Sequence, residues 1–343
     1  MEKFSRIGMD TSKQFFQLHG VDDRERVILR RQLRRKEVLA FFARVAPTVV
    51  GLEACGGSHY WGRELARLGH EVRVIAPQYV KPYVKRGKND TADAEAICEA
   101  MSRPSMRFVP IKSAESQAAL MLAGLRERLV RNRAQLANAI RGYATEFGIV
   151  AAKGRAKIEP LLQRLGADES IPALARALFA DCAKEYRHLT DQLDAIETKL
   201  LRWHRANETS RRLAQIPGVG PVIASLLVMK TADPKAFRSG RQFAAWLGLT
   251  PKDHSTAGKI RLGVITRAGD ETLRSLLVVG ATAVIWQARR GKSRNASPWL
   301  RALLARKPPK LVAVALANKI ARVAWKLMIT GDAYDPGHAA VRA

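Results

Sequence analysis

The sequence predicts a mixed α/β domain followed by a mainly α-helical region, and three patterns indicate this division. Short apolar segments typical of strands alternate with helical patterns over the first 76 residues. A heptad pattern of apolar residues then runs through the middle third, and the last third combines helical periodicity with glycine turns. Because 343 residues exceed one ordinary core, we expect two or three domains.

The charge of the chain predicts a polyanionic partner. There are 59 Lys and Arg against 31 Asp and Glu, a formal charge of +28, and residues 206–343 alone carry 23 Lys and Arg against 7 Asp and Glu. Nucleic acid is the leading partner class. An anionic membrane would call for a basic tract beside an amphipathic or spanning helix, and we expect none. The apolar segment 311–328 is interrupted by Lys319, Arg322 and Lys326, which indicates a helix of a soluble domain.

The cysteines and the N-terminus favour a cytoplasmic protein. The first eight residues lack the apolar segment and cleavage site of a signal peptide. Cys55, Cys98 and Cys182 are far apart in the sequence and form no Cys-x-x-Cys metal pattern. Three cysteines without a framework of pairs fit a reducing compartment.

The first part of the chain reads as one α/β layer. Three strands form a meander, and helices then alternate with two further strands. The expected strands are residues 6–10, 14–20, 24–30, 48–53 and 71–76, and the expected helices are residues 35–45 and 59–68.

Four acidic residues of this domain are candidates for a metal site. Asp10 and Glu53 end two predicted strands, which would expose them at one edge of the sheet. Asp90 and Asp93 stand three apart where an alanine-rich helix begins, so they share a helix face. Four carboxylates brought together repel one another unless a divalent cation neutralises them, and oxygen ligands suit Mg²⁺ or Mn²⁺. Such a layout is typical of phosphoryl transfer.

Each acid also has a purely structural alternative. Asp90 is predicted as the N-cap of the helix at residues 91–100, with Asp93 complementing the helix dipole in the first turn. Asp10 could begin a turn, and Glu53 could be a partly exposed charge at a strand end.

The middle of the chain predicts an antiparallel helical coiled coil. After an extended link at residues 104–110, a helix is expected over 116–147, with Arg126, Arg131 and Arg133 on faces that could touch nucleic acid or simply be solvated. Residues 148–166 read as a basic, irregular connection. A second helix is expected over 171–207, and its heptad seam consists of Tyr186, Leu189, Leu193, Ile196, Leu200 and Trp203. The pattern leaves open whether this seam closes within one chain or between chains.

The last third begins with a predicted helix-hairpin-helix. Residues 213–225 place Gly218 and Gly220 between two helices, where backbone N–H groups can hold a DNA phosphate. A purely structural hairpin is the alternative. The domain is expected to end with a helix over 311–328 that packs back on it.

A polar loop at residues 252–259 is the second candidate site. It contains Ser255 and Thr256, and basic side chains follow at Lys259, Arg261 and Arg267. A hydroxyl of this loop could attack a phosphorus atom while the cations stabilise the developing charge. The alternative is that both hydroxyls only cap a turn.

The motifs around the acids resemble those of a known family. The segments Ile7-Gly8-Met9-Asp10, Gly51-Leu52-Glu53-Ala54 and Lys88-Asn89-Asp90-Thr91-Ala92-Asp93-Ala94 are similar to those of the Asp-Glu-Asp-Asp transposases of the insertion sequence 110 family, relatives of the Piv and MooV DNA invertases. The resemblance implies a ribonuclease H-like fold of the Holliday-junction resolvase branch. It also implies that Asp10, Glu53, Asp90 and Asp93 are the metal ligands. Lys88 matches the family pattern too and could touch a phosphate, and a solvated lysine is the alternative.

The same resemblance reaches the polar loop. Family members often carry Ser-Ser-Gly-Gly or Ser-Thr-Gly-Gly where this chain has Ser255-Thr256-Ala257-Gly258, and a serine of that loop forms a covalent link to the DNA end. The resemblance therefore implies Ser255 as the nucleophile, with Thr256 in reserve. It further implies a structured bridge RNA that pairs with donor and target DNA, and a dimer or tetramer joined by the coiled coil.

Together these expectations give an α/β plus all-α chain with four parts. They are a ribonuclease H-like domain (1–112), a coiled-coil region (113–207), a C-terminal transposase domain (208–331) and a tail (332–343). The expected function is site-specific DNA recombination through a phosphoserine intermediate. A metal-dependent junction nuclease that uses water, and a non-catalytic nucleic-acid-binding protein, are the alternatives.

Overall fold

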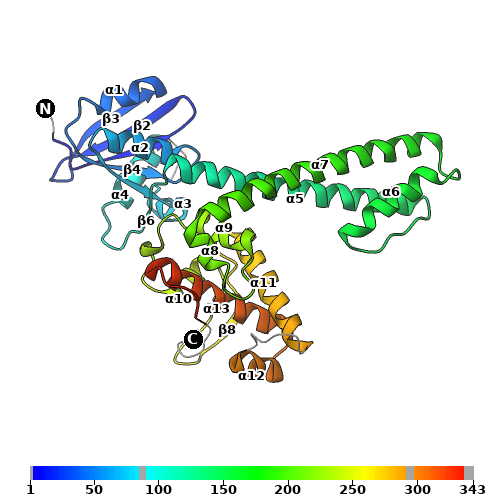
Figure 1. Cartoon of the computed structure of the whole chain (residues 1–343). Coiled ribbons are helices and arrows are strands. Elements are labelled where there is room, and N and C mark those ends of the chain that lie inside the picture. The colour runs from blue at the N-terminus through cyan, green and yellow to red at the C-terminus, as the bar shows by residue number, and fades with distance from the viewer. Residues whose placement is uncertain (1–2, 85–89, 291–296, 336–343) are drawn as a thin grey trace. The chain divides into compact units, whose positions relative to one another are not determined.

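The computed structural model describes residues 3–84, 90–290 and 297–335 (Figure 1). The chain divides into two compact units, Met1–Gln117 and Ala118–Ala343. Within the described segments, none of the helices combines the length and apolar character needed to cross a lipid bilayer. The four-part domain division inferred from the sequence stays a prediction.

The first unit is built on a six-stranded mixed sheet, which confirms the predicted α/β class. Its strand order is β3-β2-β1-β4-β5-β6. The central strands β1, β4 and β5 are parallel, and the outer pairings are antiparallel. The strands are β1 (Arg6–Thr11), β2 (Phe15–Val21), β3 (Val27–Arg34), β4 (Val49–Glu53), β5 (Glu71–Ile75) and β6 (Phe108–Val109).

Two strands differ from the prediction by more than one residue. β3 starts three residues later than expected, because Asp22 accepts hydrogen bonds from the N–H groups of Arg24 and Arg26 and holds residues 22–26 in a turn. The segment expected as an extended link contributes β6, which pairs with the end of β5. A two-residue strand carries too little periodicity to be recognised from sequence.

Helices cover both faces of this sheet. On one face, α1 (Val38–Phe42) and α2 (Ser58–Arg67) share an apolar cluster with the strands. The other face carries α3 (Pro77–Val80) and α4 (Asp90–Ala100), which share a second cluster with Ile75. The helix α4 begins at Asp90 itself. This residue is therefore in the first helical turn and not at the N-cap position that we predicted.

The second unit contains two long helices that run antiparallel, α5 (Ala114–Glu146) and α7 (Ala173–Ala206). Leu129 of α5 packs with Leu189 and Leu193, while Arg126 pairs with Glu197 nearer the end of α7. Most of the predicted seam is buried, namely Tyr186, Leu189, Leu193 and Leu200. The seam thus closes within one chain against α5. Supercoiling of the pair stays a prediction.

The predicted irregular connection between these helices is wrong, because it contains the helix α6 (Ile158–Ala167). Four apolar residues of α6 are buried at helical spacing, namely Ile158, Leu161, Leu162 and Leu165. They form a cluster with the C-terminal part of α5 and the N-terminal part of α7. Pro160 is tolerated because the first-turn N–H groups of a helix have no intrahelical acceptor.

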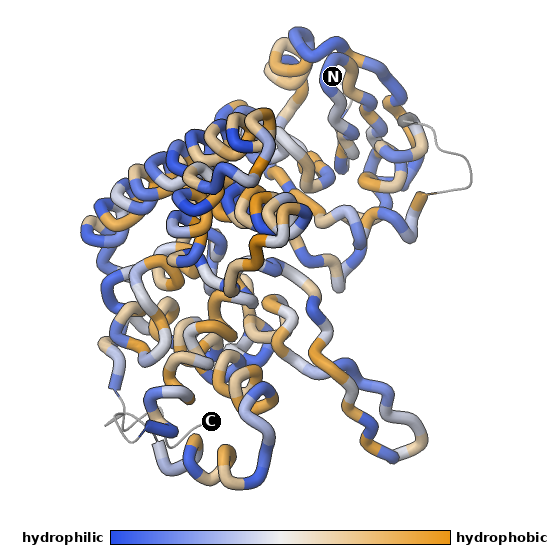
Figure 2. Tube along the Cα trace, turned by 90° about the vertical axis from the view of Figure 1, so that its right-hand side faces the viewer, coloured by the Kyte–Doolittle hydropathy of each residue, from blue (hydrophilic) through white to orange (hydrophobic). Residues whose placement is uncertain are grey.

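Among the described residues, the remaining elements of this unit are helices and one hairpin. A large core joins the start of α5 to the C-terminal helices, among which α13 packs against α10 and α11. The elements are α8 (Glu208–Leu213), α9 (Pro221–Lys230), α10 (Gly240–Trp246), β7 (Pro251–Asp253), β8 (Leu262–Ile265), α11 (Glu271–Arg289), α12 (Pro298–Arg306) and α13 (Pro309–Thr330). Figure 2 shows polar and apolar residues alternating along the helices, while the β7–β8 hairpin projects from them.

Candidate functional site

Asp10 and Glu53 lie at the same end of two adjacent parallel strands. The strands β1 and β4 are in register up to the pair Met9 and Leu52, and the two acids come next. Successive side chains of a strand point to opposite faces. Met9 and Leu52 face the cluster under α1 and α2, so Asp10 and Glu53 belong to the opposite face, which α4 covers.

Two glycines bring α4 onto that face. A Cβ atom added to Gly8 would lie 2.3 Å from the carbonyl oxygen of Ala94, and one added to Gly51 would lie 2.6 Å from Met101 Sδ. A side chain at Gly8 would therefore require α4 to move, because the atoms it meets are helix backbone, whereas one at Gly51 would displace the side chain of Met101. Because Gly8 and Gly51 stand two residues before Asp10 and Glu53, the close approach also fixes where Asp93 of α4 lies relative to the strand ends.

Glu53 lies near enough to Asp10 and Asp93 for their charges to act on its carboxyl group. Burial raises the pKa of Glu53 above its ordinary value, and the negative charges of Asp10 and Asp93 raise it further. Like charges act on a carboxyl group in this way only at short range. The loops after the two strands are also in contact, since Thr11 Oγ1 lies 3.1 Å from Cys55 Sγ.

This site has the donor chemistry of a divalent-cation site. Carboxylate oxygens are ligands that a hard divalent cation prefers. Among the described side chains, no three His, Cys, Asp or Glu are grouped closely enough to hold an ion. The fourth predicted ligand, Asp90, starts α4 three residues before Asp93, but its side chain lies outside the description, as does the whole of Lys88.

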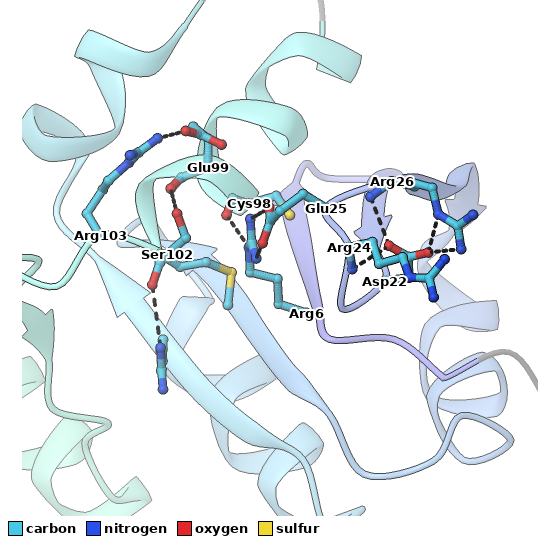
Figure 3. Close-up of polar contacts among 11 residues, drawn as sticks. Arg6, Asp22, Arg24, Glu25, Arg26, Cys98, Glu99, Ser102 and Arg103 are labelled. Atoms are coloured by element: carbon cyan, nitrogen blue, oxygen red, sulfur yellow. Dashed lines mark hydrogen bonds and ion pairs between the residues drawn. The ribbon is translucent and has the colours of Figure 1, made fainter.

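A buried arginine fastens α4 to the sheet. Arg6 Nε donates to the carbonyl oxygen of Cys98 over 2.9 Å, and the two terminal nitrogens of the guanidinium bind the carboxylate of Glu25 (Figure 3). Glu25 sits in the β2–β3 turn with a positive φ of 62°. Arg6 therefore ties the last turn of α4 to β1 and to the β2–β3 turn.

The second candidate site is the β7–β8 hairpin, which the sequence predicted only as a loop. Its strands pair Pro251 with Ile265, and the turn closes where the N–H of Lys259 donates to the oxygen of Thr256 over 2.9 Å. Both central residues of the turn have positive φ, 49° at Ala257 and 78° at Gly258. This is the conformation of a type I′ turn, which favours glycine, asparagine or aspartate.

Ser255 lies one residue before this turn and is exposed. Its N–H donates to Asp253 Oδ1 over 2.8 Å, and its Oγ accepts from the N–H of Arg261 over 3.1 Å. A hydrogen bond from the Ser255 side chain also lowers the pKa of Asp253. The hydroxyl is thus oriented from two sides and remains open to solvent. Thr256 is exposed as well.

Basic residues accompany Ser255 along the hairpin. Lys259 and Arg261 are exposed on it, and Arg267 follows it with a positive φ of 57°. The base of the hairpin is fixed, because the buried Arg274 donates to the carbonyl oxygens of Leu247 and Ala268 at 3.2 and 2.9 Å.

The two glycines of the predicted helix-hairpin-helix have different surroundings. Gly218 has a φ of +87°, and a Cβ there would lie 2.9 Å from the oxygen of Gly280 in α11, so this glycine is required for packing. Gly220 precedes α9, and a Cβ added to it would meet none of the described atoms within 4 Å. Only the surroundings of Gly220 leave room for a phosphate.

The three arginines predicted on α5 also differ. Arg126 is bound to Glu197, with Nη2 and Oε1 2.7 Å apart, so its charge is largely neutralised. Arg131 makes an exposed pair with Glu127 at 3.3 Å. Arg133 has a buried nitrogen, Nη1, without a hydrogen-bond partner among the described residues.

Four residues that support these sites were not recognised from the sequence. Gly8 and Gly51 stood out only as parts of motifs, although a glycine two positions before each strand-end acid is a visible signal. Asp253 forms an Asp-x-Ser pattern with Ser255, which is typical of a turn in which the aspartate side chain accepts a hydrogen bond from the backbone N–H two residues later. Arg6 carried no signal, because its partners are 19 and 92 residues away.

Comparison with known proteins gives matches in both parts of the chain. Residues 7–148 match the DEDD transposase profile of IS110 elements, described as a transposase, and residues 210–305 match a profile described as the "Transposase IS116/IS110/IS902 family". Both candidate sites fall inside these ranges.

Similar proteins extend over nearly the whole chain. A protein of Sinorhizobium fredii assigned to the transposases, y4pF/y4sB, is 67% identical over 97% of this chain and 86% of its own length. The transposase for insertion sequence element IS1328 of Yersinia enterocolitica is 39% identical, covering 98% of this chain and 100% of that protein. The transposase for IS1111A of Coxiella burnetii is 37% identical over 98% and 93%.

Proposed function

The chain belongs to the IS116/IS110/IS902 family of transposases, and from this premise we propose that it cuts and rejoins DNA strands through a phosphoserine intermediate at Ser255. It is a DNA transposase of an insertion sequence. The observation that carries the proposal is the orientation of an exposed serine hydroxyl by Asp253 and by the Arg261 N–H.

The acidic residues would hold the metal. The DEDD family match indicates use of a divalent ion, and we propose Mg²⁺ or Mn²⁺ bound by Asp10, Glu53, Asp93 and Asp90. When bound, the ion would neutralise phosphate charge. The role of the protein would be to hold the carboxylates close together. The raised pKa of Glu53 supports this, and the hydrogen bond from Arg6 to Cys98 holds α4 against the sheet.

Ser255 would carry the covalent step. Its Oγ forms a bond to the phosphorus, and the bond from phosphorus to the sugar oxygen breaks. The proton of the hydroxyl passes to solvent after Asp253 has oriented it, and the departing sugar oxygen takes up a proton. Attack by the hydroxyl of another strand end reverses these changes and restores a phosphodiester, so no external energy source is needed.

The positive side chains near the hairpin would bind the scissile strand. Lys259, Arg261 and Arg267 can stabilise the charge on the phosphate, and the open N-terminus of α9 after Gly220 suits a second phosphate. Arg131 and Arg133 of α5 are further proposed contacts, as is Lys88. Donor DNA, target DNA and a structured bridge RNA are the proposed partners.

The acids belong to the first compact unit and Ser255 to the second. A dimer or tetramer is the proposed assembly.

The test is a covalent assay with the full chain, donor DNA, target DNA, guide RNA and Mg²⁺. The wild type and Thr256→Ala should form a protein–DNA adduct, and Ser255→Ala should form none. Cleavage without any adduct would point instead to a metal-dependent nuclease that uses water. If Asp10→Asn changes neither cleavage nor metal dependence, the acidic site has been misassigned.

A further inference from the structure

A basic cavity lies between the start of α10 and the second half of α13. Its volume is about 890 Å³, within the range of roughly 300–1,000 Å³ common for pockets that hold small molecules. Four cationic side chains and two aromatic ones line it, namely Arg241, Lys319, Arg322, Lys326, Trp325 and Tyr334. None of them belongs to the acidic site or to the Ser255 hairpin.

The cationic wall follows from the spacing along α13. Lys319, Arg322 and Lys326 stand three and four residues apart and so share one helix face. Arg241 of α10 adds a fourth charge. In the described part of the chain none of these four side chains forms an ion pair. Burial lowers the pKa of Lys319, and the positive charge of Arg322 lowers it further, which indicates a positive potential that an anion would relieve.

The walls of the cavity are held in place. A Cβ added to Gly240 would lie 3.2 Å from the Cα, Cβ and O atoms of Arg322, so α10 and α13 touch at this point. The Trp325 indole N–H donates to the oxygen of Pro234 over 2.9 Å. The backbone N–H of Tyr334 donates to Gln215 Oε1 over 3.3 Å, and its side chain packs partly buried against the main core.

Aromatic and cationic groups together favour a nucleotide over a bare anion. A base can stack on an aromatic ring while the attached phosphate meets the cations, which is how single strands are bound without sequence preference. Asp332 and Asp335 also line the cavity and would repel a second phosphate. This leaves one phosphate next to the α13 face.

We propose that the cavity binds one unpaired nucleotide of a nucleic-acid strand, with the phosphate against Lys319, Arg322 and Arg241 and the base against Tyr334. RNA and DNA strands share this chemistry. The inference goes beyond recombination at Ser255, because it assigns a separate binding site that needs neither the metal nor the nucleophile.

The test measures binding of fluorescent eight-nucleotide oligo(U) RNA and oligo(dT) DNA to the full chain at several salt concentrations. Lys319→Gln with Arg322→Gln should weaken binding of at least one of the two oligonucleotides roughly tenfold. The slope of the logarithm of the binding constant against the logarithm of the salt concentration should become shallower by about 0.7 for each phosphate that the cations no longer neutralise. The matched control is Arg301→Gln with Arg306→Gln in α12, which removes the same charge outside the cavity. Its binding should fall much less.

A second pair of variants tests the stacking and guards against misfolding. Tyr334→Phe should bind as the wild type does, whereas Tyr334→Leu should bind roughly tenfold more weakly. Oligonucleotides carrying 4-thiouridine or 4-thiothymidine should crosslink to peptides containing Trp325 or Tyr334. Equal binding by the cavity and α12 variants, or crosslinks confined to other peptides, would overturn the proposal. Ser255→Ala should bind like the wild type, so failure of the nucleophile assignment would leave this result intact.

Discussion

Arg6 and Cys98 are joined by a hydrogen bond from Nε to the backbone oxygen, over 2.9 Å and 92 residues of sequence. The side chain of Arg6 is 11% exposed, and Glu25 neutralises its charge. This contact couples the stability of the first unit to the position of the helix that carries Asp93.

Removal of this contact should destabilise the protein. Arg6→Met leaves the Cys98 oxygen without its donor and Glu25 without its cation, so we expect the free energy of unfolding to fall by about 2–3 kcal/mol. Urea denaturation measures this change. Arg26→Met is the control, because the side chain of Arg26, which pairs with Asp22, is 68% exposed; its removal should cost no more than about 1 kcal/mol. Equal losses for the two variants would contradict a special role for Arg6.

The acidic site predicts opposite effects of one substitution with and without metal. Asp93→Asn removes a charge that raises the pKa of Glu53, so the metal-free protein should melt at a higher temperature than the wild type. The wild type should gain about 2.7 kcal/mol of stability at a free Mg²⁺ concentration one hundred times its Kd, and the variant should gain much less. Thermal melts with and without Mg²⁺ measure both the melting temperature of the metal-free protein and the stability gained from the ion.

Glu71→Gln is the control for that experiment, since Glu71 begins β5 and pairs with Arg73. It should leave the response to Mg²⁺ unchanged. A normal Mg²⁺ response in Asp93→Asn would remove this residue from the ligand set.

The turn beside Ser255 predicts a stabilising substitution. Ala257 has a φ of +49°, a conformation that costs a residue with a Cβ about 1 kcal/mol relative to glycine. Ala257→Gly should therefore slow exchange of the Lys259 amide hydrogen about fivefold, measured by hydrogen–deuterium exchange. Ala245→Gly in α10 should instead destabilise its helix. Faster exchange at Lys259 in Ala257→Gly would show that the strain is absent.

His59 predicts how stability depends on pH. Its Nδ1 accepts the N–H of Lys112 over 3.3 Å, and burial, followed by the charges of Lys112 and Arg63, lowers its pKa from 6.5 to about 4. Between these values the unfolded chain takes up a proton and the folded chain does not. Stability should therefore fall as pH decreases from 6.5 to 4. His59→Gln should show a smaller fall over this range in urea titrations.

The sequence predicted the elements that carry the acids better than those that carry Ser255, for physical reasons. Asp10 and Glu53 follow apolar runs whose burial fixes strand position and facing, so local pattern sets their geometry. The β7–β8 hairpin lacks such a pattern, because its apolar residues Ile260, Leu262 and Val264 are all exposed. Its form depends on a turn and on the distant anchor Arg274. The short helix α6 was missed because glycines and basic residues dominate the segment before it.

The buried seam of α7 limits how copies of this chain can associate. Tyr186, Leu189, Leu193 and Leu200 already pack within the chain, so pairing through that stripe would require two subunits to exchange whole helices. Leu174 and Leu178, one turn apart and 74% and 57% exposed, form a separate stripe at the start of α7. Assembly through these two leucines would leave the α5–α7 pair of each subunit intact. Association would then be a reversible equilibrium set by protein concentration, because no helix has to unfold first.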